Sequence, residues 1–337
     1  MKKHINIPIF IPHYGCPNAC VFCNQKKITG KPSFVKENVM NDIETVLSTV
    51  DLSVSEVELA FFGGSFTALP KNEILDLLTI SDHWLSLGKI SSVRLSTRPD
   101  AIDEEILDIL HSHGVKTIEL GIQSFSDNVL SASKRGHTAL QSEKACKMIK
   151  ERGFELIGQM MVGLPSSTTE DEIMTAKRIC ELSANGARVY PTVVFPDTEL
   201  DRMKNDGRYT PLSNEDAVIR TAEVLSVFAR YRVPVIRIGL CANETLSDEQ
   251  FSTNYHPSVG EKAINLIFRK NMYKLLSEAR LPEGKNAVFS VAKGKISQAV
   301  GQKRSNVTAL LRDFKLNGIS VVEKDYLDGY AISLEII

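Results

Sequence analysis

Short apolar runs alternate with longer amphipathic segments from residue 5 to about residue 240, and this alternation constrains the fold more than any other feature. The runs are rich in β-branched residues and end at Gly, Pro or Ser, as is typical of strands buried on both faces. Between them, apolar residues recur at helical spacing, for example over residues 39–50 and 102–110. The runs are IPIFI (7–11), VELAFF (57–62), SVRLST (92–97), TIELGI (117–122), ELIGQMMVG (155–163), ARVYPTVV (187–194) and PVIRIGL (234–240).

Strands that are each followed by a helix-length segment predict parallel pairing through right-handed crossovers. An open doubly wound sheet and a (β/α) barrel both satisfy this pattern. The barrel is favoured because unusual residues lie at the C-terminal ends of the strands, where β/α barrels build their active sites. We therefore expect an α/β fold with a partial (β/α) barrel of about six to seven parallel strands. These strand-end residues are Gly63, Gly64, Ser65, Ser96, Arg98, Gln123, Gly163 and Pro165.

The regular alternation weakens after residue 240. We predict a barrel over residues 1–240, a linker at 241–260 and a small basic α+β domain at 261–337. The stretch SQAVGQKRSNVTALL also suggests a helix-turn-helix, because a Gly separates two helical segments, but its apolar spacing does not match that motif closely. In the last domain we expect helices from Glu261 to about Ala279 and near Val307–Lys315, and strands at 287–292, 319–323 and 330–336.

The net charge of −1 conceals an asymmetry between the two parts of the chain. Residues 255–337 contain 13 Lys+Arg and 8 Asp+Glu, whereas the other residues contain 27 and 33. A basic module on an acidic body is one signature of nucleic-acid binding, although such an imbalance is often only solvated surface. No apolar run approaches the roughly 18–20 residues that span a bilayer. Pro8 and Pro12 interrupt the first apolar run, so we expect a strand rather than a signal peptide, and a cytoplasmic protein.

Three of the six cysteines, Cys16, Cys20 and Cys23, form a CxxxCxxC directly after the first predicted strand. A tight cluster in an intracellular chain indicates metal binding rather than disulfides. Three thiolates can ligate three irons of a cubane cluster and leave the fourth iron open to a substrate or cofactor. Structural zinc with His13 as fourth ligand is the alternative, since Cys₃His sites are common. Cys146 and Cys180 lie in amphipathic segments, where cysteines are usually small buried hydrophobes.

The cysteine spacing, with Phe22 before the third cysteine, resembles the radical S-adenosylmethionine (radical SAM) superfamily, which places a glycine motif where Gly63-Gly64-Ser65 stands. Further motifs are similar to the catalytic subunit family of Elongator, which modifies the wobble uridine of tRNA. This similarity covers roughly residues 5–280, and its GIQSF and GLP segments are shared with oxygen-independent coproporphyrinogen oxidases. The motifs are STRPD (96–100), ELGIQSF (119–125), KRGHT (134–138), GLP (163–165), RVYPT (188–192) and KNDGRYTP (204–211).

The resemblance implies that Cys16, Cys20 and Cys23 ligate a [4Fe-4S] cluster whose open iron binds S-adenosylmethionine. Reductive cleavage of S-adenosylmethionine would then release a 5′-deoxyadenosyl radical that acts on tRNA. The implied partners are S-adenosylmethionine, tRNA and an electron donor such as flavodoxin or ferredoxin, with no membrane. Elongator subunits continue into an acetyltransferase domain; too few residues follow here, so we expect none, and the acetyl-CoA-dependent step is in doubt.

The resemblance also implies which residues bind S-adenosylmethionine, and each has a structural alternative. Gly63, Gly64 and Ser65 would contact the methionine amino group, or form a tight turn. Ser96, Gln123, Arg135 and Gln159 match positions that contact the cofactor in the porphyrinogen oxidases, although Arg135 also suits a surface helix start. Gly163 would shape the turn beneath the adenine, which packing alone also explains.

Several further strand residues have no settled role in the sequence. Arg98, Arg188 and Arg237 lie within or at the ends of predicted strands, where they would bind an anionic group or form salt bridges. Tyr190 suits core packing better than a substrate contact. His137 is a candidate functional histidine without a metal partner at ligand spacing.

Three functions remain open from the sequence alone. The favoured one is a radical SAM enzyme that modifies tRNA. The second is a coproporphyrinogen-oxidase-like enzyme acting on a small molecule. The third is a zinc-bound RNA-binding protein without radical activity.

Overall fold

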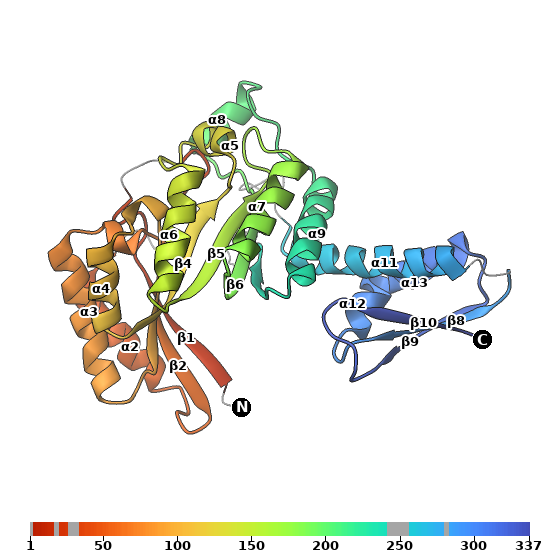
Figure 1. Cartoon of the computed structure of the whole chain (residues 1–337), viewed down its shortest axis with the longest axis horizontal. Helices are drawn as coiled ribbons and strands as arrows, with labels where there is room; N and C mark the ends of the chain where they lie inside the picture. Colours follow the sequence, from red (N-terminus) through yellow and green to blue (C-terminus); the bar gives the residue numbers. More distant parts are fainter. Residues whose placement is uncertain (1–2, 17–19, 26–33, 241–255, 280–282) are drawn as a thin grey trace. The chain divides into compact units, whose positions relative to one another are not determined.

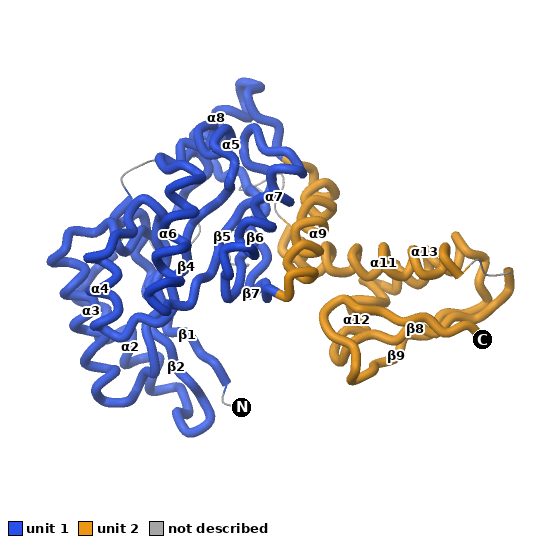
Figure 2. Tube along the Cα trace, in the orientation of Figure 1, with its two compact units in different colours: residues 1–211, 233–255 blue, residues 212–232, 256–337 orange. Residues whose placement is uncertain are grey.

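The computed structural model describes residues 3–16, 20–25, 34–240, 256–279 and 283–337 (Figure 1). The chain divides into two compact units, residues 1–211 with 233–255 and residues 212–232 with 256–337 (Figure 2). Most of the linker predicted at 241–260 lies outside the described residues, and so does the sixth cysteine of the chain, Cys241. The predicted domain boundaries therefore remain a prediction.

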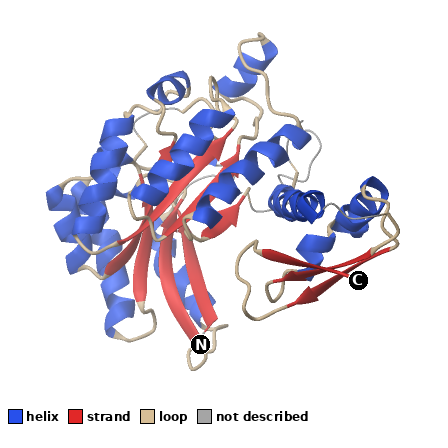
Figure 3. Cartoon of the chain, turned by 45° about the vertical axis from the view of Figure 1, so that its right-hand side comes forward, coloured by secondary structure: helices blue, strands red, loops and turns tan. Residues whose placement is uncertain are grey.

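The described part of the first unit contains a curled sheet of seven parallel strands with helices on its outer face (Figure 3). Each strand pairs with the next one along the chain, as helical crossovers between consecutive strands require. This arrangement confirms the predicted partial barrel. The strands are β1 (Lys3–Phe10), β2 (Ser55–Phe62), β3 (Ser92–Thr97), β4 (Val115–Gln123), β5 (Glu155–Val162), β6 (Gly186–Pro191) and β7 (Val235–Ile238).

Side-chain caps fix where two of the crossover helices begin. The hydroxyl of Thr138 accepts a hydrogen bond from the backbone N–H of Gln141, whose side chain accepts one from the Thr138 N–H. Thr168 and Asp171 form the same reciprocal pair. Each cap therefore fixes the residue at which the preceding loop ends and the helix begins. The helices are α2 (Val39–Leu47), α3 (Lys71–Ser86), α4 (Glu104–Ser112), α5 (Asp127–Ala132), α6 (Ala139–Glu151), α7 (Thr169–Glu181) and α8 (Glu199–Asn205).

The second unit packs helices on a small mixed sheet. Its central strand β8 (Asn286–Val291) pairs parallel with β9 (Gly318–Glu323) and antiparallel with β10 (Ile332–Ile336). The long helix α11 (Val259–Ala279) buries apolar side chains in the core that β8 shares, and α9 (Asn214–Arg230) belongs to the same unit. The predicted helices and strands of this region are present, each within two residues of the expected ends. None of the described helices has the length and apolar character that crossing a bilayer requires.

A helix-turn-helix occupies the stretch for which the sequence favoured this motif only weakly. Helix α12 (Ile296–Val300) leads through Gly301 and the turn Gln302–Arg304 into α13 (Ser305–Asp313). Gly301 has a φ of +80°, and a Cβ there would lie 2.7 Å from the Ser305 hydroxyl, so the turn requires glycine. The side-chain amide of buried Asn306 donates to the backbone carbonyls of Ala299 and Asn265, at 3.0 and 2.8 Å. A polar residue therefore occupies a core position, which explains why the apolar spacing was a poor guide.

Candidate functional site

The three cysteines of the CxxxCxxC lie close together on the loop after β1. Cys20 is buried, and Cys16 and Cys23 are half-buried. Burial raises the pKa of the Cys16 thiol, and neighbouring Cys20 raises it further. Burial and both other cysteines raise the pKa of Cys23 to about 12. The three thiols thus lie on one loop, near enough for each to influence the ionisation of a neighbour.

Two glycines allow the cysteine loop to pack against the loop after β2. A Cβ at Gly64 would lie 2.4 Å from the carbonyl oxygen of Tyr14 and 2.5 Å from that of Ile11. A Cβ at Gly15 would lie 2.3 Å from the carbonyl oxygen of Ser65, whose N–H donates to Tyr14 O at 3.0 Å. Close backbone approach therefore accounts for glycine at position 64, and contact with a cofactor stays a prediction.

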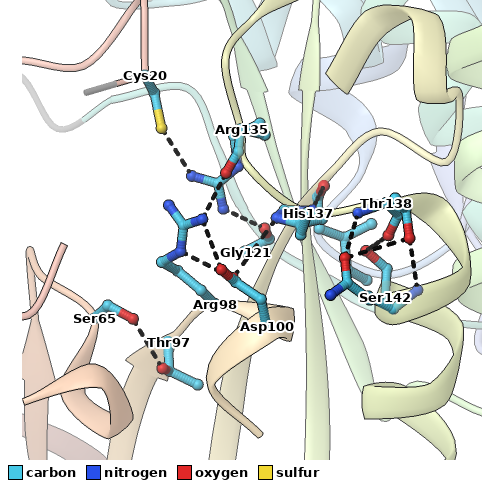
Figure 4. A network of polar contacts seen from close by, with 12 residues as sticks. Cys20, Ser65, Thr97, Arg98, Asp100, Gly121, Arg135, His137, Thr138 and Ser142 are labelled. Atoms are coloured by element: carbon cyan, nitrogen blue, oxygen red, sulfur yellow. Dashed lines mark hydrogen bonds and ion pairs between the residues drawn. The ribbon is translucent and has the colours of Figure 1, made fainter. Parts of the chain in front are cut away.

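Arg135 lies between the cysteine loop and β4 (Figure 4). Its Nη1 donates to the sulfur of Cys20 at 3.2 Å, and its Nη2 donates to the carbonyl oxygen of Gly121 at 2.7 Å. Its Nε is buried and has no hydrogen-bond partner among the described residues. Arg135 is thus buried beside a cysteine, so the explanation as a surface helix start is wrong.

Arg98 is a second buried guanidinium at the same place (Figure 4). It forms two hydrogen bonds with the carboxylate of Asp100, at 2.9 and 3.0 Å, and its Nη2 donates to the Arg135 carbonyl at 2.6 Å. Its Nη1 is buried without a partner in the described part of the chain. Both guanidiniums lower the pKa of Cys16, against the larger opposing effect of burial. The salt-bridge interpretation of Arg98 therefore holds, with one donor left over.

These residues fit an iron–sulfur cluster. Three thiols share one short loop, and an unpaired buried N–H on each neighbouring arginine would otherwise cost about 1–3 kcal/mol. An anionic group with several acceptor atoms would satisfy both donors. No three His, Cys, Asp or Glu side chains in the described ranges are placed to hold a metal ion. The thiolates of a cubane bind three different irons, so they need not converge on one point.

The zinc alternative requires His13 as the fourth ligand. Its Nε2 instead accepts a hydrogen bond from the backbone N–H of Gln25, at 2.9 Å. This bond links the two ends of the cysteine loop. A zinc ion bound to His13 Nε2 would therefore have to displace this hydrogen bond.

The other predicted cofactor residues are arranged at the strand ends. The side-chain amides of Gln123 and Gln159 donate to each other, at 2.7 and 2.8 Å. Ser96 is half-buried on β3, beside Glu119 of β4 in the strand register. The Gly163 N–H donates to the Glu172 carboxylate at 2.6 Å, and the Gly163 carbonyl accepts from the Tyr209 hydroxyl at 2.7 Å. Gly163 has a φ of +81°, which suits glycine in this turn, and its place beneath the adenine stays a prediction. The two glutamines form a hydrogen-bonded pair across neighbouring strands.

Thr97, the last residue of β3, links this strand to the loop after β2, and the sequence analysis assigned it no role. Its hydroxyl lies 3.1 Å from that of Ser65 and 2.5 Å from that of Thr67. Gly63 has a φ of +91°, and its carbonyl accepts from the His13 N–H at 3.3 Å. The available signal was the position of Thr97 within STRPD, next to Ser96.

Buried charges form a network on the concave face of the sheet. Arg94 of β3 donates to Glu58 at 2.6 Å and to Glu119 at 3.0 Å. Arg188 of β6 donates to Glu119 at 2.8 Å, and its guanidinium lies 5.3 Å from the ring centre of Phe62. Contacts among β2, β4 and β6, which are not neighbours, are possible only where the sheet curls inward. Salt bridges therefore account for Arg188. The charged residues inside the strand segments SEVELAFF, SVRLST and TIELGI were the sequence signal for this network, and the sequence analysis did not use them.

Three further candidate residues remain. Tyr190 lies 3.2 Å from Arg188 Nη1, and burial raises the pKa of its hydroxyl. The Nε of Arg237 donates to the Gly239 carbonyl at 3.2 Å. Burial, and next the charge of Arg135, lower the pKa of His137 to about 4, so its ring is neutral at pH 7. Its Nδ1 is buried without a hydrogen bond to any described residue, 4.0 Å from Asp100.

Comparison with known families gives two consecutive matches along the chain. The model for the radical SAM superfamily matches residues 10–179, which is half of the chain and includes the cysteine loop. A model for the radical SAM C-terminal domain matches residues 184–274. The first match therefore covers the site assembled above.

Relatives with related sequences differ in length. An uncharacterized protein of Methanocaldococcus jannaschii is 27% identical, over 68% of this chain and 74% of its own. The tRNA uridine(34) acetyltransferase of the same organism is 32% identical, over 60% of this chain and 45% of its own. Human Elongator complex protein 3 is 29% identical, over 52% and 36% respectively. The chain thus spans less than half of the two relatives named for their function.

Two solved structures share the fold. The Elp3 protein of Methanocaldococcus infernus aligns with a TM-score of 0.58 and 19% identity, over 84% of this chain and 64% of its own. Coproporphyrinogen III oxidase of Escherichia coli, a radical SAM enzyme, aligns with a TM-score of 0.51 and 20% identity, over 68% and 53%. At these identities the likeness concerns the fold.

Proposed function

Because this chain belongs to the radical SAM superfamily, we propose that it binds a [4Fe-4S] cluster and S-adenosylmethionine and uses them to modify tRNA. Superfamily membership and the enzymes among its structural neighbours make the chain an enzyme. Membership of an enzyme superfamily favours this proposal over a zinc-bound RNA-binding protein without radical activity.

The observation that carries the proposal is that three cysteines share one loop and that an arginine donates a hydrogen bond to one of their sulfurs. Cys16, Cys20 and Cys23 would hold the cluster, and Arg135 already donates to the Cys20 sulfur at 3.2 Å. With S-adenosylmethionine bound, the cluster would supply a 5′-deoxyadenosyl radical once a flavodoxin or ferredoxin reduces it.

The protein's own groups would position the cofactor and keep water away. Arg135 and Arg98 each have an unpaired buried N–H, and charge-assisted hydrogen bonds to the carboxylate of S-adenosylmethionine would satisfy these donors. The backbone of Gly63, Gly64 and Ser65 would contact the methionine amino group. Gln123 and Gln159 would offer amide groups, and Ser96 a hydroxyl, from neighbouring strands. The surrounding side chains are largely buried, which strengthens such polar contacts.

The choice of tRNA rests on the relatives. One is named a tRNA uridine(34) acetyltransferase, and others are Elongator complex protein 3. The excess of basic residues in 255–337 is compatible with a polyanionic substrate. A porphyrinogen substrate would require neither feature.

Anaerobic reconstitution with iron and sulfide, followed by reduction and mass spectrometry, tests the radical chemistry. We expect 5′-deoxyadenosine from the wild type and from Cys180→Ala, which removes a thiol of α7 that lies outside the cysteine cluster. Cys20→Ala should produce none. A colourless wild-type protein with stoichiometric zinc would overturn the proposal.

A separate measurement tests the substrate. Bulk tRNA is incubated with the reduced enzyme, digested, and its nucleosides are compared with those from the Cys20→Ala reaction. We expect a new uridine derivative only with the wild type. Conversion of a porphyrinogen together with unchanged tRNA would overturn the tRNA assignment and leave the superfamily chemistry intact.

A further inference from the structure

The helix-turn-helix of the second unit exposes basic side chains to which the proposed radical chemistry assigns no role. We call the turn Gln302–Arg304 with the exposed side of α13 the basic turn surface. Lys303 and Arg304 are exposed, and neither forms an ion pair with a residue in the described ranges. Their charges are therefore available to a partner.

The net charge of this part of the chain is concentrated around that surface. Residues 286–322 contain six Lys or Arg and a single acidic residue, Asp313. The rest of residues 255–337 contains seven basic and seven acidic residues. The six basic residues lie in the loop before α12 (Lys293, Lys295), in the turn (Lys303, Arg304), in α13 (Arg312) and just after α13 (Lys315), so the positive charge gathers around the helix-turn-helix. A uniformly solvated surface would not require such a concentration.

Helix α13 presents one face to the core and the opposite face to solvent. Val307 and Leu310 are buried in the core of the unit. Ser305, Thr308 and Arg312 recur at three- and four-residue spacing and are exposed, with the Arg312 side chain 76% accessible. The ion pair of Arg312 with adjacent Asp313 is exposed and so contributes little. The exposed face therefore combines two hydroxyls with a guanidinium.

The turn holds its two basic residues in an unfavourable backbone conformation. Lys303 has φ 51° and ψ 33°, and Arg304 has φ 60° and ψ 25°. Each such left-handed residue costs on the order of 1 kcal/mol unless it is Gly, Asn or Asp. Lys and Arg occupy these two positions, although the backbone conformation there would be less strained with Asn. The strain marks these two side chains as candidates for a function.

We propose that the basic turn surface binds the phosphate backbone of a helical arm of RNA. Lys303, Arg304 and Arg312 would pair with phosphates, and in helix-turn-helix modules the second helix is the element that lies against the nucleic acid. The hydroxyls of Ser305 and Thr308 can both donate to and accept from 2′-hydroxyls, which line the wide minor groove of an RNA helix. The choice of RNA over DNA rests on the proposed function, whereas the surface itself does not depend on it.

A double variant with Asn at both turn positions tests the proposal on the full-length chain. Lys303→Asn with Arg304→Asn removes two charges and retains a residue type that tolerates the left-handed conformation. Binding of unmodified tRNA is measured by fluorescence anisotropy from 50 to 300 mM salt. Each lost phosphate contact should reduce the slope of log affinity against log salt by about 0.7–0.9, so the double variant should lose about 1.5. Affinity should fall at least about fivefold at the lowest salt.

The control changes two other exposed lysines of the same unit, Lys274→Gln with Lys285→Gln, and has the same net charge. It should bind tRNA with the wild-type slope. An equal loss in both variants, or no loss in the turn variant, would overturn the proposal. Equal affinity for a DNA duplex of matched length, lost equally in the turn variant, would overturn the choice of RNA. Reductive cleavage of S-adenosylmethionine by the wild type, measured without RNA, tests the proposed function separately.

Discussion

Replacing Glu119 by Gln should destabilise the first unit strongly, because the carboxylate neutralises two buried guanidiniums. Its side chain is 5% exposed and accepts from Arg94 at 3.0 Å and from Arg188 at 2.8 Å. Arg94 would keep Glu58 at 2.6 Å, but Arg188 would lose the one carboxylate that pairs with it in the described structure.

The magnitude follows from the cost of an unpaired buried charge. Removing one partner of a buried ion pair typically costs 3–5 kcal/mol. Gln retains the size of Glu119 and one acceptor oxygen, so no cavity adds to this cost. We therefore expect the free energy of unfolding to fall by about 3 kcal/mol.

The single tryptophan, Trp84, lies in α3 of the first unit, so its fluorescence follows the unfolding of that unit in urea. The matched control is Glu143→Gln. Glu143 also pairs with two cations, Lys147 and Arg178, both at 2.7 Å, but its side chain is 27% exposed and those of its partners are 57% and 37% exposed. Exposed pairs contribute little, so the control should unfold like the wild type. Equal unfolding midpoints for both variants would refute the argument from burial.

Three further predictions concern single side chains. The pKa of His137 is about 4 in the folded chain, against 6.5 in the unfolded chain. The free energy of unfolding should therefore decrease by about 3 kcal/mol as the pH falls from above 6.5 to below 4. Urea unfolding of His137→Gln should not show this decrease. Gly64→Ala should displace the cysteine loop and lower the iron bound per chain, whereas Gly88→Ala, which meets nothing within 4 Å, should not. Gly301→Ala should cost about 1–3 kcal/mol and reduce hydrogen-exchange protection of α13 but not of α3, with Gly294→Ala as the open-space control.

The order and type of the elements could be predicted because they depend on local periodicity. The run SVRLST coincides with β3, most other runs end within two residues of the observed strands, and sequential βα units allow few topologies. The helix-turn-helix was harder to predict because α12 is a single turn and buried Asn306 interrupts the apolar pattern. Tertiary hydrogen bonds to α11 and α12 make that polar position acceptable, and the sequence does not show them.

The candidate site could be predicted only in part, for a related reason. Cys16, Cys20 and Cys23 are close in the sequence, so their spacing alone indicates a shared ligand. Arg135 lies 115 positions from Cys20, and nothing local indicates that its guanidinium reaches that sulfur.

The sequence by itself determined a barrel of βα units with a thiol loop after its first strand and a basic module at its end, since each follows from residues near one another in the chain. Only the tertiary structure decided how the strand charges are used. Curling of the sheet places Glu119 between Arg94 and Arg188, and the loop packing at Gly64 sets the cysteine loop beside Arg135. Buried charges must find partners within reach, and the chain's path in space determines which partners those are.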